Sequence, residues 1–210
     1  MSPLQLTLHE ARVLACLVEK SITTPAYYPM TTNGLMAAAN QKSSRSPVLS
    51  LSEGEVGQAL ITLEEKSLVS RDDLSSRATK WRHKFQHQLL LKKETLAVLS
   101  TLMLRAAQTP AELRANAAAL GGPADTEGVL AALNDLLDRA QPLVVQLALA
   151  PGQSAARWAH LLSGEPPAQP LHSEDDSAAP VSSRSHLESR IEALEARVAQ
   201  LEALLQSFKP

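Results

Sequence analysis

The sequence predicts a mainly α-helical protein with small β-hairpins, and an internal repeat is the first observation that supports this. A run near residue 80 returns near residue 157, and it aligns Trp81 with Trp158 and His83 with His160. These are the only two tryptophans in the chain. In both copies, helical spacing of apolar residues comes first and strand-like alternation comes last. Aromatic residues make up only 3% of the chain, which favours helices packed on helices.

The first repeat opens with a helix that Thr7 caps. Glu10 stands three residues on, so the two side chains form a capping box, in which each satisfies a backbone amide of the other. The helix runs to about Lys20 and is apolar on several sides, which predicts a central position. A loop with two prolines follows, and a second helix carries Leu35 and Ala39.

A third helix and a β-hairpin complete the first repeat. Ser52 and Glu55 form another capping box, and an apolar stripe follows behind them. A strand begins at Leu68, residues 72–78 form a turn, and a return strand covers residues 79–85. Three helices followed by a hairpin is the winged-helix arrangement, a helix-turn-helix with a hairpin appended. In the return strand, alternation separates two groups of side chains onto opposite faces: Trp81, His83 and Phe85 on one, and Lys80, Arg82 and Lys84 on the other.

The second repeat contains the same parts in the same order. Its first helix is expected over residues 93–107, and its second helix begins at Thr109 with Pro110 and a capping Glu112. The third helix begins at Asp125 or Thr126 and ends near Arg139. The segments 143–149 and 155–162 are expected to form its hairpin.

The C-terminal part of the chain changes character after the second repeat. Residues 164–186 are rich in Pro, Ser and acidic residues, which predicts a disordered linker. Residues 187–208 form a heptad array with β-branched residues or Leu at position a and mostly Leu at position d, which favours a parallel two-stranded coiled coil. A single amphipathic helix folded back on the body is the alternative. The residues expected at the dimer seam are Leu187, Ile191, Leu194, Val198, Leu201 and Leu205.

The predicted architecture is therefore tandem winged-helix domains with a C-terminal coiled-coil helix. We place the domains at residues 1–91 and 92–163, the linker at 164–186 and the coiled coil at 187–208. Cys16 is the only cysteine and lies in an apolar run, so we expect a core residue in a reducing compartment. The sequence shows no signal peptide and no span long enough to cross a bilayer, so we expect a cytoplasmic protein without a membrane partner.

Several segments of the sequence resemble a known family. The matching residues are Thr7 to Lys20, Thr23 to Pro29, Asn40 to Val48, Leu51 to Val56 and Lys80 to Phe85. They are similar to the YceH-like family of bacterial proteins of unknown function, and the stretch from Asn40 to Ser43 is the most specific element. The resemblance covers roughly residues 4–163 and implies tandem winged-helix domains. It implies no catalytic residue and no cofactor.

The sequence contains no pattern that predicts an enzyme, a metal site or a cofactor. Gly-rich phosphate loops, serine-nucleophile motifs and zinc-ligand spacings are all absent from it. His83 and His160 each follow a tryptophan by two residues, which favours a shared packing role. We expect no catalytic residues.

Charge points to the first repeat as a candidate DNA-binding surface. Residues 1–93 hold 12 Lys and Arg against 8 Asp and Glu, a net charge of +4, although the whole chain carries −2. The basic residues gather on the first hairpin and the loop before the third helix, where phosphate contact is plausible. The candidate DNA-contacting residues are Lys42, Arg45, Arg71, Arg77, Lys80, Arg82 and Lys84.

Two alternatives stay open at this point. Charged side chains also protect an exposed edge strand from aggregation, without any ligand. In addition, both third helices carry acidic residues such as Glu53 and Asp135, which would repel phosphates. The leading hypothesis is a dimeric DNA-binding protein, such as a transcriptional regulator. The second is a protein-interaction adaptor that uses the acidic helices.

Overall fold

The computed structural model describes residues 4–72, 78–149 and 153–166, and they form a mainly helical body with two small antiparallel sheets. The first repeat contains α1 (Leu8–Thr23), α2 (Thr32–Ala39) and α3 (Glu53–Glu65), followed by β2 (Val69–Asp72) and β3 (Lys80–His83). The second contains α5 (Lys93–Leu104), α6 (Pro110–Ala117) and α7 (Thr126–Leu137), followed by β4 (Val144–Gln146) and β5 (Trp158–His160). Three helices followed by a hairpin therefore occur twice.

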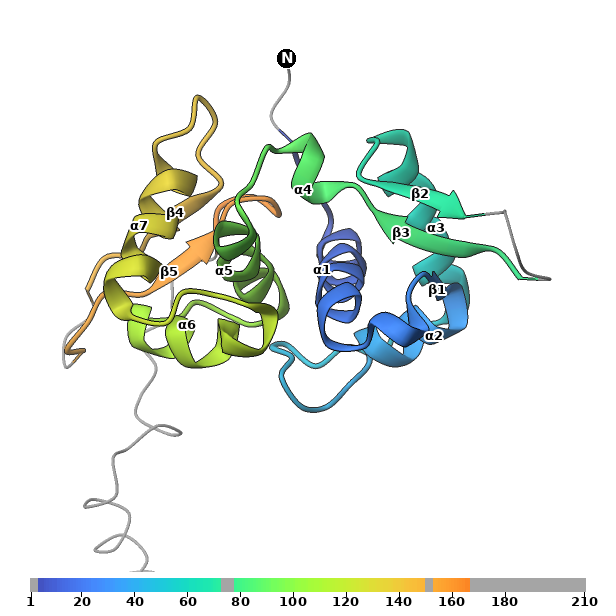
Figure 1. The fold of residues 1–210 in the computed structure, drawn as a ribbon, viewed down its shortest axis with the longest axis horizontal. Coiled ribbons are helices and arrows are strands. Elements are labelled where there is room, and N and C mark those ends of the chain that lie inside the picture. Colours follow the sequence, from blue (N-terminus) through green and yellow to red (C-terminus); the bar gives the residue numbers. More distant parts are fainter. Residues whose placement is uncertain (1–3, 73–77, 150–152, 167–210) are drawn as a thin grey trace, which may run out of the picture. The chain divides into compact units, whose positions relative to one another are not determined.

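Helices α1 and α5 lie side by side at the centre of the described body (Figure 1). Thr7 and Glu10 form the expected capping box at the start of α1. Every residue of α1 from Glu10 to Val18 is buried, and so is every residue of α5 from Thr95 to Leu104. Each helix is buried on all sides because it packs both against its own repeat and against the other central helix.

Helices α3, α6 and α7 begin where the sequence places them. Ser52 with Glu55 caps α3, and Thr109 with Glu112 caps α6, each as a complete capping box. The Asp125 side chain caps α7 by accepting a hydrogen bond from Gly128 N. These local signals are strong because a side chain three residues away satisfies an amide that the helix cannot.

The first sheet has three strands in the order β1–β3–β2, so β3 is central. The additional strand β1 (Met30–Thr31) pairs with Trp81 and Lys80 of β3, and it lies just before α2. The second sheet contains only β4 and β5, and a single bridge from Gln108 to Trp158 occupies the place that β1 has in the first. Thus each tryptophan is hydrogen-bonded to the segment before the second helix of its repeat.

The return strand of the first hairpin is shorter than the sequence predicts. It ends at His83, and Phe85 begins a short helix, α4 (Phe85–Gln88). Phe85 is fully buried and packs in the core, so the chain turns out of the sheet to bring its ring inward. The loop after α1 is also more ordered than expected, because it contains a 3-10 helix over Pro25–Tyr27.

One continuous hydrophobic core runs through both repeats. It includes Leu14 of α1, Leu60 of α3, Leu99 of α5 and Leu133 of α7, all fully buried. The division into domains at residues 91 and 92 therefore stays a prediction about folding. The expected coiled coil and all but three residues of the expected linker lie outside the described residues.

Candidate nucleic-acid interface

The first hairpin sorts its side chains onto two faces, as alternation predicts. Directly paired residues share a face, and Arg71 pairs with Trp81 while Asp72 pairs with Lys80. Trp81 is 5% exposed, so its face is the one that packs on the body. Lys80 and Arg82 lie on the opposite, open face.

Arg71 lies on the tryptophan face, apart from Lys80 and Arg82. Its guanidinium carbon is 5.2 Å from the centre of the Trp81 ring, and its Nη2 is 3.0 Å from Glu64 Oε2 of α3. The cation–π contact holds Arg71 over Trp81 of β3, and the ion pair links it to α3. This arginine therefore belongs to a different face of the hairpin from the other basic residues.

The open face carries one ion pair and a line of basic residues. Arg82 Nη2 donates to Asp72 Oδ2 at 2.6 Å, and this hydrogen bond raises the pKa of the Arg82 guanidinium. Half of the Arg82 side chain is still exposed. Lys84 follows the strand, held by its backbone N–H, which donates to Leu68 O, and its side chain is exposed. We call Lys80, Arg82 and Lys84 the wing cations.

Arg45 corrects the sequence-based list of candidate DNA contacts, because its side chain is fully buried. Its Nη2 lies 2.6 Å from Glu19 Oε2 of α1, and its Nε donates to Ala38 O at 3.2 Å. Burial is the largest single influence and lowers the pKa of Arg45, but the hydrogen bond to Glu19 and the interactions with Cys16 and the Glu19 charge together outweigh it and raise the pKa. Since the guanidinium is used inside the protein, Arg45 does not face solvent.

The buried arginine fixes the loop between α2 and α3. Asn40 closes the same loop, because its Nδ2 donates to Leu51 O at 2.8 Å and its Oδ1 accepts from Leu51 N at 2.7 Å. Lys42 is exposed on this closed loop. The specific stretch that begins at Asn40 is therefore explained by loop closure, and only Lys42 offers a surface charge there.

The other predicted residues lie outside the described part of the chain. Arg77 falls between β2 and β3 in the chain, and the six residues of the expected dimer seam belong to the C-terminal segment. Neither group can be placed relative to the wing cations. Their roles stay predictions.

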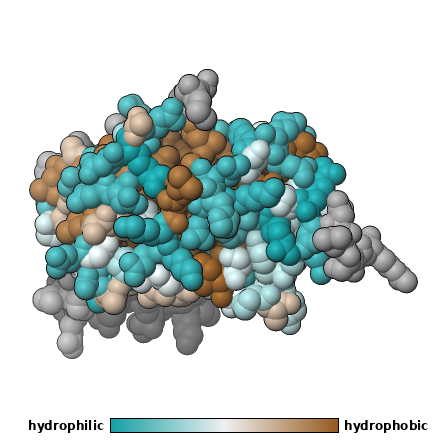
Figure 2. Space-filling model, turned by 45° about the horizontal axis from the view of Figure 1, so that its top comes forward, coloured by the Kyte–Doolittle hydropathy of each residue, from teal (hydrophilic) through white to brown (hydrophobic). Residues whose placement is uncertain are grey.

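The third helices present carboxylates to solvent. Glu53, Glu55 and Glu65 are exposed on α3, Glu127 and Asp135 are exposed on α7, and Asp138 is exposed directly after it. The first repeat therefore carries exposed carboxylates on α3 as well as the wing cations on its hairpin. Figure 2 shows a face that is mostly hydrophilic, with hydrophobic residues gathered in a few separate areas.

The two equivalent histidines are half-buried and uncharged at neutral pH. Burial lowers the pKa of His83 and of His160 to about 4 in each case. His83 Nε2 lies 3.2 Å from Ser21 Oγ, and its backbone N–H donates to Tyr28 Oη at 2.7 Å. Across the described residues, no group of His, Cys, Asp and Glu has an arrangement suited to a metal ion. The Cys16 thiol is fully buried, and burial raises its pKa to about 11.

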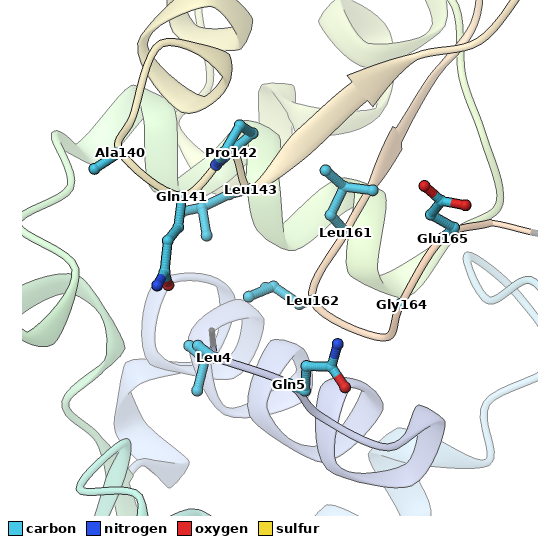
Figure 3. Close-up of a pocket in the computed structure, with 10 residues that line it drawn as sticks. All are labelled: Leu4, Gln5, Ala140, Gln141, Pro142, Leu143, Leu161, Leu162, Gly164 and Glu165. Carbon is cyan, nitrogen blue, oxygen red and sulfur yellow. The ribbon is translucent and has the colours of Figure 1, made fainter. Parts of the chain in front are cut away.

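A surface hollow of about 350 Å³ lies between the N-terminal segment and the second hairpin. Figure 3 shows Leu4, Leu143 and Leu162 around this hollow, with Glu165 at its edge. Leu6 N donates to Leu162 O, which ties the N-terminal segment to the second repeat. The residues that line this hollow are mostly apolar, and no two titratable groups meet there.

Sequence reasoning missed the acidic partners of the basic residues. Asp72 and Glu64 pair with Arg82 and Arg71, and Glu112 pairs with Arg157 through both guanidinium nitrogens at 3.0 and 3.1 Å. Asp72 and Arg82 are diagonal neighbours on the paired strands β2 and β3, so their ion pair can be predicted once the strand register is known. The Glu64 contact depends on how α3 packs on the hairpin, so no local signal reveals it.

Fold and surface define a mainly helical, internally repeated protein, and comparison with known proteins places it in a family. Residues 6–153 match the family described as "Protein of unknown function, DUF480". The chain belongs to this family, which confirms the predicted resemblance to an uncharacterised bacterial family.

Curated relatives cover almost the whole chain. A UPF0502 protein of Burkholderia pseudomallei is 43% identical over 96% of this chain and 87% of its own length. A UPF0502 protein of Shewanella piezotolerans is 41% identical over 98% of both chains, and one of Geobacter sulfurreducens is 42% identical over 91% and 88%. Among the described residues, no helix is long and apolar enough to cross a membrane.

Proposed function

We propose that this protein is a cytoplasmic tandem winged-helix protein that binds duplex DNA through the first hairpin and has no catalytic activity. The twice-repeated order of three helices and an antiparallel hairpin supports the winged-helix assignment. The fold by itself is only an analogy for function. The surface of the first hairpin therefore has to support the DNA-binding part of the proposal.

The observation that carries the proposal is the difference between the two hairpins. The wing cations Lys80, Arg82 and Lys84 lie at or beyond the open face of β3. In the second repeat, Arg157 is occupied by Glu112, Ala159 is buried, and Leu161 replaces the third cation. Edge protection alone does not account for this difference, because β3 is the central strand of its sheet and not an edge.

The acidic surface of α3 sets how the DNA is contacted. Exposed Glu53, Glu55 and Glu65 repel phosphates, so α3 is poorly suited to the major groove. We therefore propose contact with the sugar–phosphate backbone by the wing cations, assisted by Lys42 and Arg77, with little sequence specificity. A protein of this kind acts as a regulator or organiser of DNA rather than as a reader of one site.

Dimerisation through residues 187–208 is part of the same proposal. Two copies joined by a parallel coiled coil present two sets of wing cations to one duplex. Linked binding raises the effective concentration of the second hairpin, so a weak contact becomes useful. The heptad pattern of the sequence supports this step.

Fluorescence anisotropy of the full chain with a random-sequence duplex tests the proposal. Six phosphate contacts in the proposed dimer, three from each chain, predict a log–log salt slope of about −5.4, which is roughly a 400-fold loss of affinity between about 50 and 150 mM salt. The K80A/R82A/K84A variant should lose most of the binding. The control K92A/K93A/R114A removes three exposed positive charges elsewhere and should bind almost normally. Equal losses in both variants would contradict a role for the hairpin.

A protein partner for the acidic helices is the second candidate, and the surface of α7 favours it. Leu130 is 40% exposed on this helix, which also carries exposed Glu127 and Asp135. An apolar residue surrounded by carboxylates suits a basic partner protein. Affinity capture from cell lysate should then return a stoichiometric partner that is lost when Leu130→Asp is introduced, and the absence of any such partner would count against this role.

A further inference from the structure

A second, polar cavity of about 260 Å³ lies where the two repeats meet, away from the first hairpin. One side is formed by the α2–α3 loop through Ser44, Arg45 and Ser46. The other side is formed by residues 105–108 after α5 and by two residues of α6, Glu112 and Asn116. Ser46 N donates to Leu104 O at 3.0 Å, which fixes the two sides together.

Most charges around this cavity are already neutralised within the protein. Arg45 pairs with Glu19, and Arg157 donates to both oxygens of Glu112. Arg105 lines the cavity and is half-buried, and within the described residues its guanidinium has no hydrogen-bond acceptor and no ion pair. The positive charge of Arg105 is therefore left without a paired carboxylate in this cavity.

The unpaired guanidinium is held in place by its backbone. Arg105 N donates to Thr101 O at the end of α5, and three residues later Gln108 is hydrogen-bonded in both directions to Trp158. Burial, followed by the nearby Arg45, lowers the pKa of Arg105, and the Glu19 carboxylate offsets this only in part. A guanidinium that loses water without gaining an acceptor is destabilised unless an anion binds it.

The neighbouring groups are hydrogen-bond donors of the kind that anions need. Ser44 and Ser46 contribute hydroxyls, and Asn116 Nδ2 uses one proton on Gln108 Oε1 at 2.7 Å and keeps a second. The planar fork of a guanidinium matches the two oxygens of a carboxylate or phosphate. The volume suits a small ligand and is too small for a nucleotide.

We propose that this cavity binds a small anion carrying a phosphate or carboxylate group, with the Arg105 guanidinium as its main donor. Such a ligand bridges the α2–α3 loop of the first repeat and the α5–α6 segment of the second. The proposal is independent of DNA binding, since none of the wing cations lines the cavity.

An NMR titration of the full chain tests this site, with inorganic phosphate and succinate as separate probes at constant ionic strength in chloride. One probe should produce saturable shifts in the amide signals of Ser44, Ser46 and Arg105. The probe that saturates identifies the chemistry. The R105Q variant should bind the probe at least about tenfold more weakly, because it lacks the charge-assisted pair.

Two further variants keep the test decisive. R114Q removes an exposed arginine of α6 that does not line the cavity, so it should bind like the unmodified chain. R105K keeps the charge without the fork and should show an intermediate affinity, and it replaces R105Q if that variant fails to fold. Linear, non-saturating shifts with both probes would overturn the proposal. The same affinity in the unmodified chain, R105K and R105Q would overturn it as well.

Discussion

In the first repeat, β3 carries Lys80 and Arg82 on its open face, whereas the second repeat has Arg157 and Ala159 at the equivalent positions. The core positions differ much less, because Trp81 and Trp158 are both buried and His83 and His160 share the same low pKa. The two copies therefore keep the residues that pack the hairpin against its helices and change the residues that face outward. This pattern indicates that the framework is common to both repeats and that the surface of each has a separate role.

The interior also differs between the repeats. The first contains two buried arginines, Arg12 and Arg45, which hold the α2–α3 loop. The second joins the equivalent helices through a shorter segment, in which a 3-10 helix over Ala118–Leu120 ends in a turn at Gly121. Gly121 has a φ of 73°, a left-handed conformation that glycine adopts without strain. A long loop needs internal polar contacts to be ordered, while a short turn needs only the right backbone.

Removing Arg45 should have the largest effect on this comparison. Arg45→Ala removes the buried guanidinium that pairs with the Glu19 carboxylate. We therefore expect a loss of about 3–5 kcal/mol in the free energy of unfolding. The matched change in the second repeat is Arg157→Ala, whose side chain is 26% exposed beside Glu112. It should cost about 1 kcal/mol or less. Urea denaturation of both variants measures the difference, and similar costs would show that the Arg45 pair is not buried in solution.

Truncating the central helices tests whether the two repeats unfold together. Leu99→Ala on α5 should cost about 2–5 kcal/mol, because its fully buried side chain leaves a cavity in the shared core. Two single-tryptophan chains, W81F and W158F, then report unfolding in one repeat each. We expect both reporters to shift to the same urea midpoint in the Leu99→Ala background. Separate midpoints would mean that the repeats are independent domains.

Acid should destabilise both repeats through their equivalent histidines. An unfolded histidine binds a proton below pH 6.5, but His83 and His160 bind one only near pH 4 in the folded protein. Between these values the unfolded state holds more protons, so stability falls as the pH is lowered, by up to about 3 kcal/mol for each histidine. Thermal unfolding of H83Q and H160Q across pH 4 to 7 measures this. Each variant should lose about half of the histidine-dependent slope, and an unchanged slope would contradict burial of that ring.

These contrasts also explain which parts of the structure the sequence can predict. Capping boxes such as Thr7 with Glu10 involve residues three positions apart, so the sequence alone contains both partners. The two faces of β3 follow from alternation for the same reason. The sequence predicts a surface position for Arg45, because its partner Glu19 lies on α1, 26 residues away in the chain. The two-residue strand β1 has no local signal, because only its pairing with Trp81 and Lys80 defines it.

The smallest stability effect should come from the ion pair on the first hairpin. Arg82 and Asp72 approach to 2.6 Å, the same distance as Arg45 and Glu19, but the Arg82 side chain is 50% exposed. Water and salt screen an exposed pair and its side chains lose entropy, so Arg82→Ala should cost less than about 1 kcal/mol. Urea denaturation at low and high salt measures this cost, and anisotropy with duplex DNA measures the binding of the same variant. Weaker DNA binding at nearly unchanged stability would assign Arg82 to the surface role of the first repeat, whereas a cost comparable to that of Arg45→Ala would make Arg82 part of the framework that both repeats share.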